Sequence, residues 1–214
     1  QQNVLVSFSN GRIESVVPAD VNNAVIPVQN LTLVPGFIDV QVNGGGGALF
    51  NTAPTLETLR TMVKAHAGFG STALLPTVIT DSVAVMQQAA DVIASAIASK
   101  LPGVLGVHFE GPHLSVPKKG VHPQQHIRQL SEAELAIYGR TDLGIKLVTV
   151  APENISPQQI RQLVTTLLPD ASEVISYQMP AFKQQRVFCY VGVFKKHVGI
   201  YPPLSFEHPL SAQL

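Results

Sequence analysis

The stretch that decides the fold reads Gly103-Val104-Leu105-Gly106-Val107-His108-Phe109-Glu110-Gly111-Pro112-His113-Leu114. This apolar run ends in a carboxylate and breaks at Gly-Pro, which is the pattern of a buried parallel strand closed by turn residues. In α/β proteins, side chains at the carboxyl ends of parallel strands face the ligand-binding site. Glu110 occupies that position, and His108 shares its face because side chains alternate along a strand. The sequence therefore predicts a strand that delivers Glu110 to a site.

Strand and helix patterns alternate on both sides of this stretch, between residues 35 and 168. The expected strands are residues 37–43, 72–80, 103–110 and 145–150, and the expected helices are residues 55–69, 82–98, 131–138 and 156–168. Helical signals are Thr55 as an N-cap, a capping box of Ser131 with Glu134, and Pro157 at the first helical position. Helical crossovers of this kind imply parallel strands. The fold class is therefore α/β, either a doubly wound sheet or about four units of a (β/α)₈ barrel.

The two ends of the chain differ from this middle part. Residues 1–34 are rich in β-forming residues, and Asn10-Gly11 predicts a two-residue hairpin turn. Residues 169–214 contain seven of the 13 Phe and Tyr residues, and no further strand–helix unit is legible there. We therefore expect three parts, residues 1–34, 35–168 and 169–214, with the last part poorly ordered.

Composition excludes several classes of function. The 14 basic and 14 acidic residues balance, so no basic excess indicates a nucleic acid or an anionic membrane as partner. The single cysteine, Cys189, excludes an internal disulfide framework. No apolar run approaches the roughly 20 residues of a spanning helix, and the N-terminus lacks the form of a signal peptide. We expect a cytoplasmic protein.

Polar side chains line one face of the first expected strand. Asp39, Gln41 and Asn43 alternate with apolar residues there. Two interpretations remain open, a solvated edge strand and a strand whose polar residues line a site. Four glycines follow, residues 44–47, which either form a simple turn or let the backbone approach a ligand closely.

Four short motifs occur here in the order and at the spacing found in one enzyme family. They are Pro35-Gly36-Phe37-Ile38-Asp39-Val40-Gln41-Val42-Asn43-Gly44, His108-Phe109-Glu110-Gly111-Pro112, Lys118-Lys119-Gly120-Val121-His122 and Thr149-Val150-Ala151-Pro152-Glu153. Through them, residues 3 to 168 resemble N-acetylglucosamine-6-phosphate deacetylase, of the amidohydrolase superfamily. The resemblance implies part of a (β/α)₈ TIM barrel, preceded by the N-terminal part of a small β-sandwich at residues 1–34.

The resemblance also implies a reaction and a cofactor. Family members hydrolyse N-acetylglucosamine 6-phosphate to glucosamine 6-phosphate and acetate, using water activated by a divalent metal ion, zinc or a similar metal. By position, Glu110 is a metal ligand, and Val121 and His122 contact the sugar. Gln41 and Asn43 stand where many amidohydrolases carry a His-x-His metal pair, which implies one tight metal site rather than two. Family enzymes are usually dimers, so a homodimer is expected.

Plainer interpretations of these residues stay open. Glu110 could be a structural carboxylate that is hydrogen-bonded to a loop, and His122 a solvated loop residue. His108 either lines the site or is a hydrogen-bonded core histidine. Lys118 and Lys119 form a solvated loop or steer an anionic sugar phosphate toward the site.

The sequence departs from the family after residue 168. A Gly-His motif and a Thr-His-Leu motif, which supply two metal-ligand histidines, are not recognisable, and neither is the family's catalytic Asp. His197 and His208 stand in no matching context. We therefore expect a truncated chain with a frameshift-like tail. Because a catalytic zinc takes three protein ligands, we expect this chain to have little or no activity. The alternatives are a non-catalytic protein that binds a sugar phosphate or pairs with another subunit, and a different metal hydrolase of the superfamily.

Overall fold

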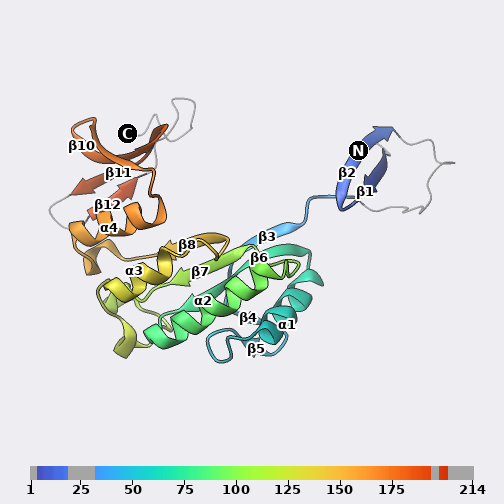
Figure 1. Cartoon of the computed structure of the whole chain (residues 1–214), viewed down its shortest axis with the longest axis horizontal. Helices are drawn as coiled ribbons and strands as arrows, with labels where there is room; N and C mark the ends of the chain where they lie inside the picture. The colour runs from blue at the N-terminus through green and yellow to red at the C-terminus, as the bar shows by residue number, and fades with distance from the viewer. Residues whose placement is uncertain (1–3, 19–31, 194–197, 202–214) are drawn as a thin grey trace. The chain divides into compact units, whose positions relative to one another are not determined.

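The computed structural model describes residues 4–18, 32–193 and 198–201, arranged in two compact units, Gln1–Pro35 and Gly36–Leu214 (Figure 1). His197 and His208 lie outside the described residues. Among the described residues, no helix combines the length and the apolar character that crossing a membrane requires.

The first unit contains a β-hairpin. Strand β1 (Val4–Ser9) pairs antiparallel with β2 (Arg12–Pro18). The turn residues Asn10 and Gly11 have positive φ angles of 51° and 73°, which matches the twist of a tight hairpin and confirms the turn expected at Asn10-Gly11. Every residue of β2 is exposed, so the described hairpin has no core of its own.

A parallel four-stranded sheet forms the centre of the second unit. Its strands are β3 (Phe37–Val42), β6 (Ser71–Ile79), β7 (Gly106–Glu110) and β8 (Ile145–Thr149), and they stand side by side in this order. Each strand therefore pairs with the strand that precedes it in the chain, and the order does not reverse. The expected parallel α/β arrangement is confirmed.

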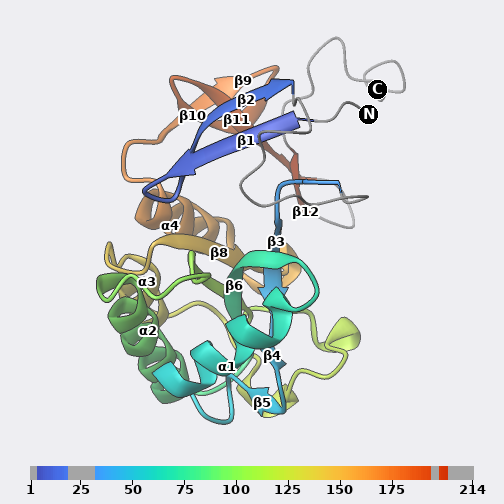
Figure 2. The same cartoon turned by 90° about the vertical axis from the view of Figure 1, so that its right-hand side faces the viewer.

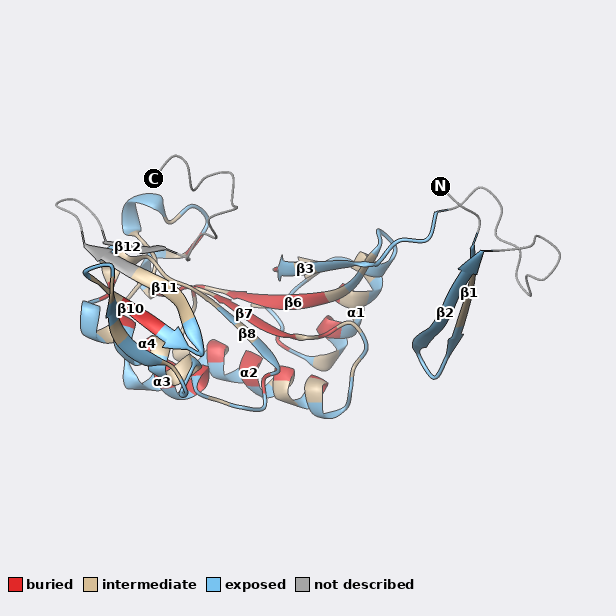
Figure 3. Cartoon of the chain, turned by 90° about the horizontal axis from the view of Figure 1, so that it is seen from above, coloured by how far each residue is buried: buried red, intermediate tan, exposed pale blue. Residues whose placement is uncertain are grey.

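Helices connect these strands. They are α1 (Leu56–Ala67), α2 (Val83–Ala98) and α3 (Glu132–Tyr138), and a fourth helix, α4 (Pro157–Leu167), follows β8. Helices α1, α2 and α3 lie along one face of the sheet (Figure 3). The expected start signals are present: Thr55 caps α1, and Ser131 with Glu134 forms the capping box of α3. Two short 3-10 turns, η1 (Val116–Lys118) and η2 (Gln124–His126), lie in the loop between β7 and α3, and a third, η3 (Pro152–Asn154), follows β8.

The core lies between the sheet and these helices. On α2, Ala89, Ala90, Ile93 and Ala96 are fully buried, and the small alanine side chains let the helix lie close to the sheet. From the sheet, Val107 and Phe109 of β7 point into this core and are also fully buried. The opposite face of β7 is left for His108 and Glu110, because side chains alternate along the strand.

The glycine run folds back beside α1. Strands β4 (Gly44–Gly45) and β5 (Ala48–Leu49) form a two-residue ladder next to that helix (Figure 2). A Cβ on Gly45 would lie 2.8 Å from His66 Nε2, so a larger residue at this position would force the His66 ring to shift. His66 of α1 bonds the Gly44 carbonyl through Nε2 at 2.9 Å, which fixes the loop that follows β3.

Part of the tail forms a second sheet. Strands β9 (Ser172–Ser176), β10 (Met179–Gln184), β11 (Arg186–Val193) and β12 (Val198–Tyr201) pair antiparallel in the order β12-β11-β10-β9. These hairpins lack the usual turn signals, because Tyr177, Gln178 and Gln185 take the positive φ angles at the turns, without glycine. The origin of this tail stays a prediction.

Candidate functional site

The candidate site lies at the carboxyl ends of the parallel strands. Glu110 ends β7, and Gln41 lies near the end of β3, with β6 between the two strands. The Gln41 side-chain amide donates a hydrogen bond of 2.7 Å to Glu110 Oε1. The structure thus brings together two of the residues that the sequence singled out, although 69 positions separate them.

Glu110 keeps part of its carboxylate open. Its side chain is 21% exposed, and His122 Nε2 lies 3.8 Å from Oε1. That distance is too long for a hydrogen bond, so the carboxylate and the imidazole face each other across a gap. A carboxylate in this position is free to bind a cation or a ligand hydroxyl.

The β7–α3 loop carries His122 back to the end of β6. His122 Nδ1 lies 2.9 Å from Thr80 Oγ1, directly after β6, and the imidazole is largely buried. Its neighbour Val121 is 87% exposed. The structure therefore places His122 beside Glu110, whereas Val121 projects into solvent.

His108 lies deeper in the sheet than Glu110. Its Nδ1 bonds the Val40 carbonyl at 3.0 Å, and its Nε2 lies 2.8 Å from Thr149 Oγ1. Burial lowers the pKa of His108, although the Val40 carbonyl and the Glu110 carboxylate act in the opposite direction. Because a carbonyl only accepts, Nδ1 carries the proton of the neutral ring and Nε2 accepts from Thr149. Both ring nitrogens of His108 are therefore occupied.

A cavity of about 600 Å³ opens next to Gln41. Its lining includes Gln41, Asn43, His66 and three of the four glycines of the run. Asn43 is partly buried, and its carbonyl accepts a hydrogen bond of 2.9 Å from the Phe50 amide. Gln41 and Asn43 therefore border an open space, and Gln41 links its wall to Glu110 through the hydrogen bond described above.

The donor set does not complete a metal site. Within the part of the chain that the structure describes, no group of three or more His, Cys, Asp or Glu side chains is placed to hold a metal ion. Of the expected ligands only Glu110 is present, and the carboxamide of Gln41 is a poor ligand for zinc. The described residues alone do not fit a catalytic zinc.

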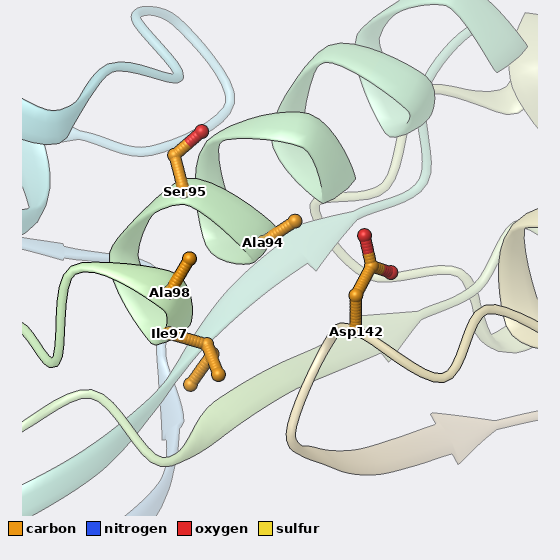
Figure 4. Close-up of a pocket in the computed structure, with 5 residues that line it drawn as sticks. All are labelled: Ala94, Ser95, Ile97, Ala98 and Asp142. Atoms are coloured by element: carbon orange, nitrogen blue, oxygen red, sulfur yellow. The ribbon is translucent and has the colours of Figure 1, made fainter.

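A second hollow, of about 370 Å³, lies away from these strand ends (Figure 4). Four small or apolar side chains of α2 and the carboxylate of Asp142 line it. Arg140 donates hydrogen bonds to Asp142 and lowers the pKa of that carboxyl. Because its only ionisable lining group is already paired, this hollow is a weaker candidate than the strand ends.

Several residues that support the site were not singled out by the sequence analysis. Asn51 bonds the Ile79 amide at 2.9 Å and Asp81 Oδ2 at 3.1 Å, which fixes the turn after β6. Arg128 donates to the Asp81 carbonyl at 2.8 Å from the far end of the β7–α3 loop. None of Asn51, Asp81 and Arg128 belongs to a motif that the sequence analysis had singled out.

Comparison with known proteins shows which enzymes this chain is similar to. No family model matches the chain. An N-acetylgalactosamine-6-phosphate deacetylase of Shewanella sp. (strain ANA-3) is 60% identical over 135 residues, covering 63% of this chain and 34% of the relative. An N-acetylglucosamine-6-phosphate deacetylase of Haemophilus influenzae is 36% identical over 149 residues, covering 68% of this chain and 39% of the relative. Most of this chain matches part of an amino-sugar-6-phosphate deacetylase.

Solved structures of deacetylases agree with this match. The N-acetylglucosamine-6-phosphate deacetylase of Pasteurella multocida superimposes with a TM-score of 0.63 at 34% identity, covering 74% of this chain and 43% of that structure. A mutant of the Mycobacterium smegmatis deacetylase, in complex with N-acetyl-D-glucosamine-6-phosphate, gives a TM-score of 0.60 at 27% identity, covering 76% and 42%. The chain thus spans less than half the length of these deacetylases.

Proposed function

We propose that this chain is the N-terminal portion of a deacetylase that hydrolyses N-acetylglucosamine 6-phosphate to glucosamine 6-phosphate and acetate. The observation that carries the proposal is Glu110, which stands at the end of β7 with Gln41 and His122 turned toward it. The matching deacetylases support the assignment of substrate class. In this role Glu110 supplies one metal ligand, and His122 contacts the sugar phosphate.

The proposed architecture is the first half of a (β/α)₈ barrel. Two features support it: the strand order does not reverse, unlike that of a doubly wound sheet, and three helices lie on one face. The hairpin of β1 and β2 would be the N-terminal part of a small β-sandwich. A homodimer and a cytoplasmic location belong to the same proposal.

The described residues do not supply all the metal ligands that this reaction needs. A divalent ion, when bound in a deacetylase of this kind, would polarise the amide carbonyl and activate water. Among the described residues only Glu110 is available as a ligand, and on that basis we expect the chain alone to have little or no activity. Incubation of the purified chain with zinc and N-acetylglucosamine 6-phosphate should release no acetate above a metal-free control. Steady release of acetate would contradict this expectation.

A chimera tests the function directly. Residues 1–168 would replace the matching portion of the Shewanella deacetylase, which supplies the remaining part of the fold. The chimera should bind metal and hydrolyse N-acetylglucosamine 6-phosphate, and E110A should abolish both metal binding and hydrolysis. A folded, metal-loaded chimera without activity on any amino-sugar 6-phosphate would refute the proposal. Full activity of E110A would refute the role of Glu110.

A second substrate has an observation in its favour. The relative with 60% identity is named for N-acetylgalactosamine 6-phosphate, while the relatives named for the glucosamine isomer are 33–38% identical. The ratio of kcat/KM for the two sugars, measured on the chimera, distinguishes them.

A non-catalytic product that binds a sugar phosphate or pairs with another subunit is the alternative from another class. Stoichiometric metal in the purified chain would favour an enzyme, and its absence would favour the alternative.

A further inference from the structure

The contact between Thr80 and His122 determines which nitrogen of the imidazole carries the proton. The backbone amide of Thr80 donates to His122 Nδ1 at 3.4 Å, and the Thr80 hydroxyl lies 2.9 Å from the same nitrogen. An amide N–H can only donate. A proton on Nδ1 would therefore oppose the amide proton in a position where both residues are largely buried.

The hydroxyl of Thr80 favours the same arrangement. Its second neighbour is the Glu110 carbonyl at 3.4 Å, which is longer than its 2.9 Å contact to His122. The hydroxyl proton is therefore better placed on the shorter bond, to His122 Nδ1. Both groups of Thr80 then donate to Nδ1, and the neutral ring carries its proton on Nε2.

The proton on Nε2 points toward the open side of Glu110. Glu110 Oε1, 3.8 Å away, is beyond hydrogen-bonding distance and already accepts from Gln41 at 2.7 Å. No other side chain or carbonyl among the described residues is within hydrogen-bonding distance of His122 Nε2. The Nε2–H group of His122 is thus oriented to donate a hydrogen bond to a ligand atom.

We propose that Thr80 is a positioning residue that locks His122 in its Nε2–H tautomer, so that His122 donates a hydrogen bond to an oxygen of the bound sugar phosphate. The donor role toward the sugar rests on the proposed function, whereas the lock rests on the geometry alone. Thr80 is itself held in place, because Asn51 fixes the amide of Ile79 and the carboxylate of Asp81 on either side of it. Arg128 secures the same turn through the Asp81 carbonyl.

Nitrogen NMR of the whole chain tests the lock. The chain would be labelled with ¹⁵N-histidine and studied at about pH 8.5, where an ordinary imidazole with a pKa of about 6.5 is neutral. The wild type should show His122 as the Nε2–H tautomer. T80V, which removes the hydroxyl at nearly constant volume, should lower the ratio of Nε2–H to Nδ1–H about five-fold, the factor expected for one hydrogen bond. T80S should restore the wild-type ratio.

T149V is the matched control. It removes the Thr149 hydroxyl, which lies 2.8 Å from His108 Nε2. The NMR signals of His108 should change, while those of His122 should stay unchanged. Circular dichroism would confirm that each variant is folded. A wild-type His122 protonated on Nδ1, or an unchanged ratio in folded T80V, would overturn the lock.

Titration with N-acetylglucosamine 6-phosphate separates the lock from the proposed function. Addition of this compound to the wild type should shift the His122 Nε2 signal, and T80V should need a higher concentration for the same shift, in proportion to its smaller fraction of Nε2–H tautomer. If the tautomer is as expected but the signal does not move, the donor role toward the sugar phosphate is wrong and the lock stands.

Discussion

At the scale of the residue, Glu134 shows how a charge is kept inside this fold. Its side chain is fully buried, and burial alone would raise the pKa of the carboxyl. Hydrogen bonds from Ser131 and from Arg128, whose Nε lies 2.6 Å away, outweigh burial and lower this pKa. The ionised carboxylate thus joins the capping box of α3 to the loop that carries His122.

Neutralising this carboxylate should destabilise the fold. E134Q removes the charge opposite the half-buried Arg128, and we expect the free energy of unfolding to fall by about 2 kcal/mol. Urea unfolding at pH 7 measures this loss of unfolding free energy. E132Q changes an exposed glutamate in the same helical turn and should alter stability by less than about 0.5 kcal/mol. Equal losses in both variants would contradict the importance of burial.

The lowered pKa of Glu134 also fixes the sign of a pH effect. Because the folded-state pKa lies below the ordinary value of about 4.3, the contribution of Glu134 is complete above that value and is lost as the pH falls through the folded-state pKa. The difference in unfolding free energy between wild type and E134Q should therefore stay nearly constant from pH 7 to about pH 5 and narrow as the pH falls below about 4.3. A difference that grows on acidification would contradict the assignment.

At the scale of the element, the close pairing of β7 with β8 depends on Gly106. Gly106 lies opposite Ile145, and a Cβ on Gly106 would come within 1.8 Å of the Ile145 carbonyl oxygen. A backbone atom of a paired strand cannot move aside without disturbing the ladder. Since β7 carries Glu110 and β8 carries Thr149, their spacing sets the geometry of the site.

G106A should therefore cost more than an ordinary glycine substitution. We expect a loss of about 2 kcal/mol or more in unfolding free energy, together with changed NMR signals for His108, which bonds Thr149 across this pair. G68A is the control, because the nearest atom to a Cβ on Gly68, at the end of α1, is 3.5 Å away. Similar stability of the two variants would show that the spacing between β7 and β8 can adjust to accommodate a Cβ at position 106.

The elements also show what the sequence could predict. Local signals were sufficient for the four parallel strands and their helices, because caps and apolar periodicity act within a few residues. The partners of Glu110 and His122 were not predictable in the same way, since Gln41 and Thr80 are 69 and 42 positions distant. In the tail, Tyr177 and Gln178 form a turn with residues that seldom adopt positive φ, so β9 and β10 left no turn signal.

At the scale of the whole molecule, the parallel sheet has two outer edges. Among the described strands, β3 and β8 are each paired on one side only. Ile38 of β3 is 63% exposed, and Ile145 of β8 is 58% exposed. Unpaired backbone groups next to exposed apolar side chains favour association with other chains.

The chain should therefore self-associate as its concentration rises. Lysine on an edge strand opposes this, so the double variant I38K with I145K should shift the onset of light scattering to a higher concentration. F69K replaces a residue that is 87% exposed but lies outside the strands, and it should have a smaller effect. If F69K shifted the onset of light scattering as much as the double variant, association would depend on general surface hydrophobicity and not on the edge strands.

The strand order of the parallel sheet also bears on how the chain folds during synthesis. Strand β6 adds to β3, β7 to β6 and β8 to β7, so each new strand finds its template already made. Nothing in this sheet has to wait for a later strand before it pairs. A ribosome that releases the chain from its N-terminus therefore allows folding to proceed strand by strand, and most of the helix-covered core can assemble before β8 emerges.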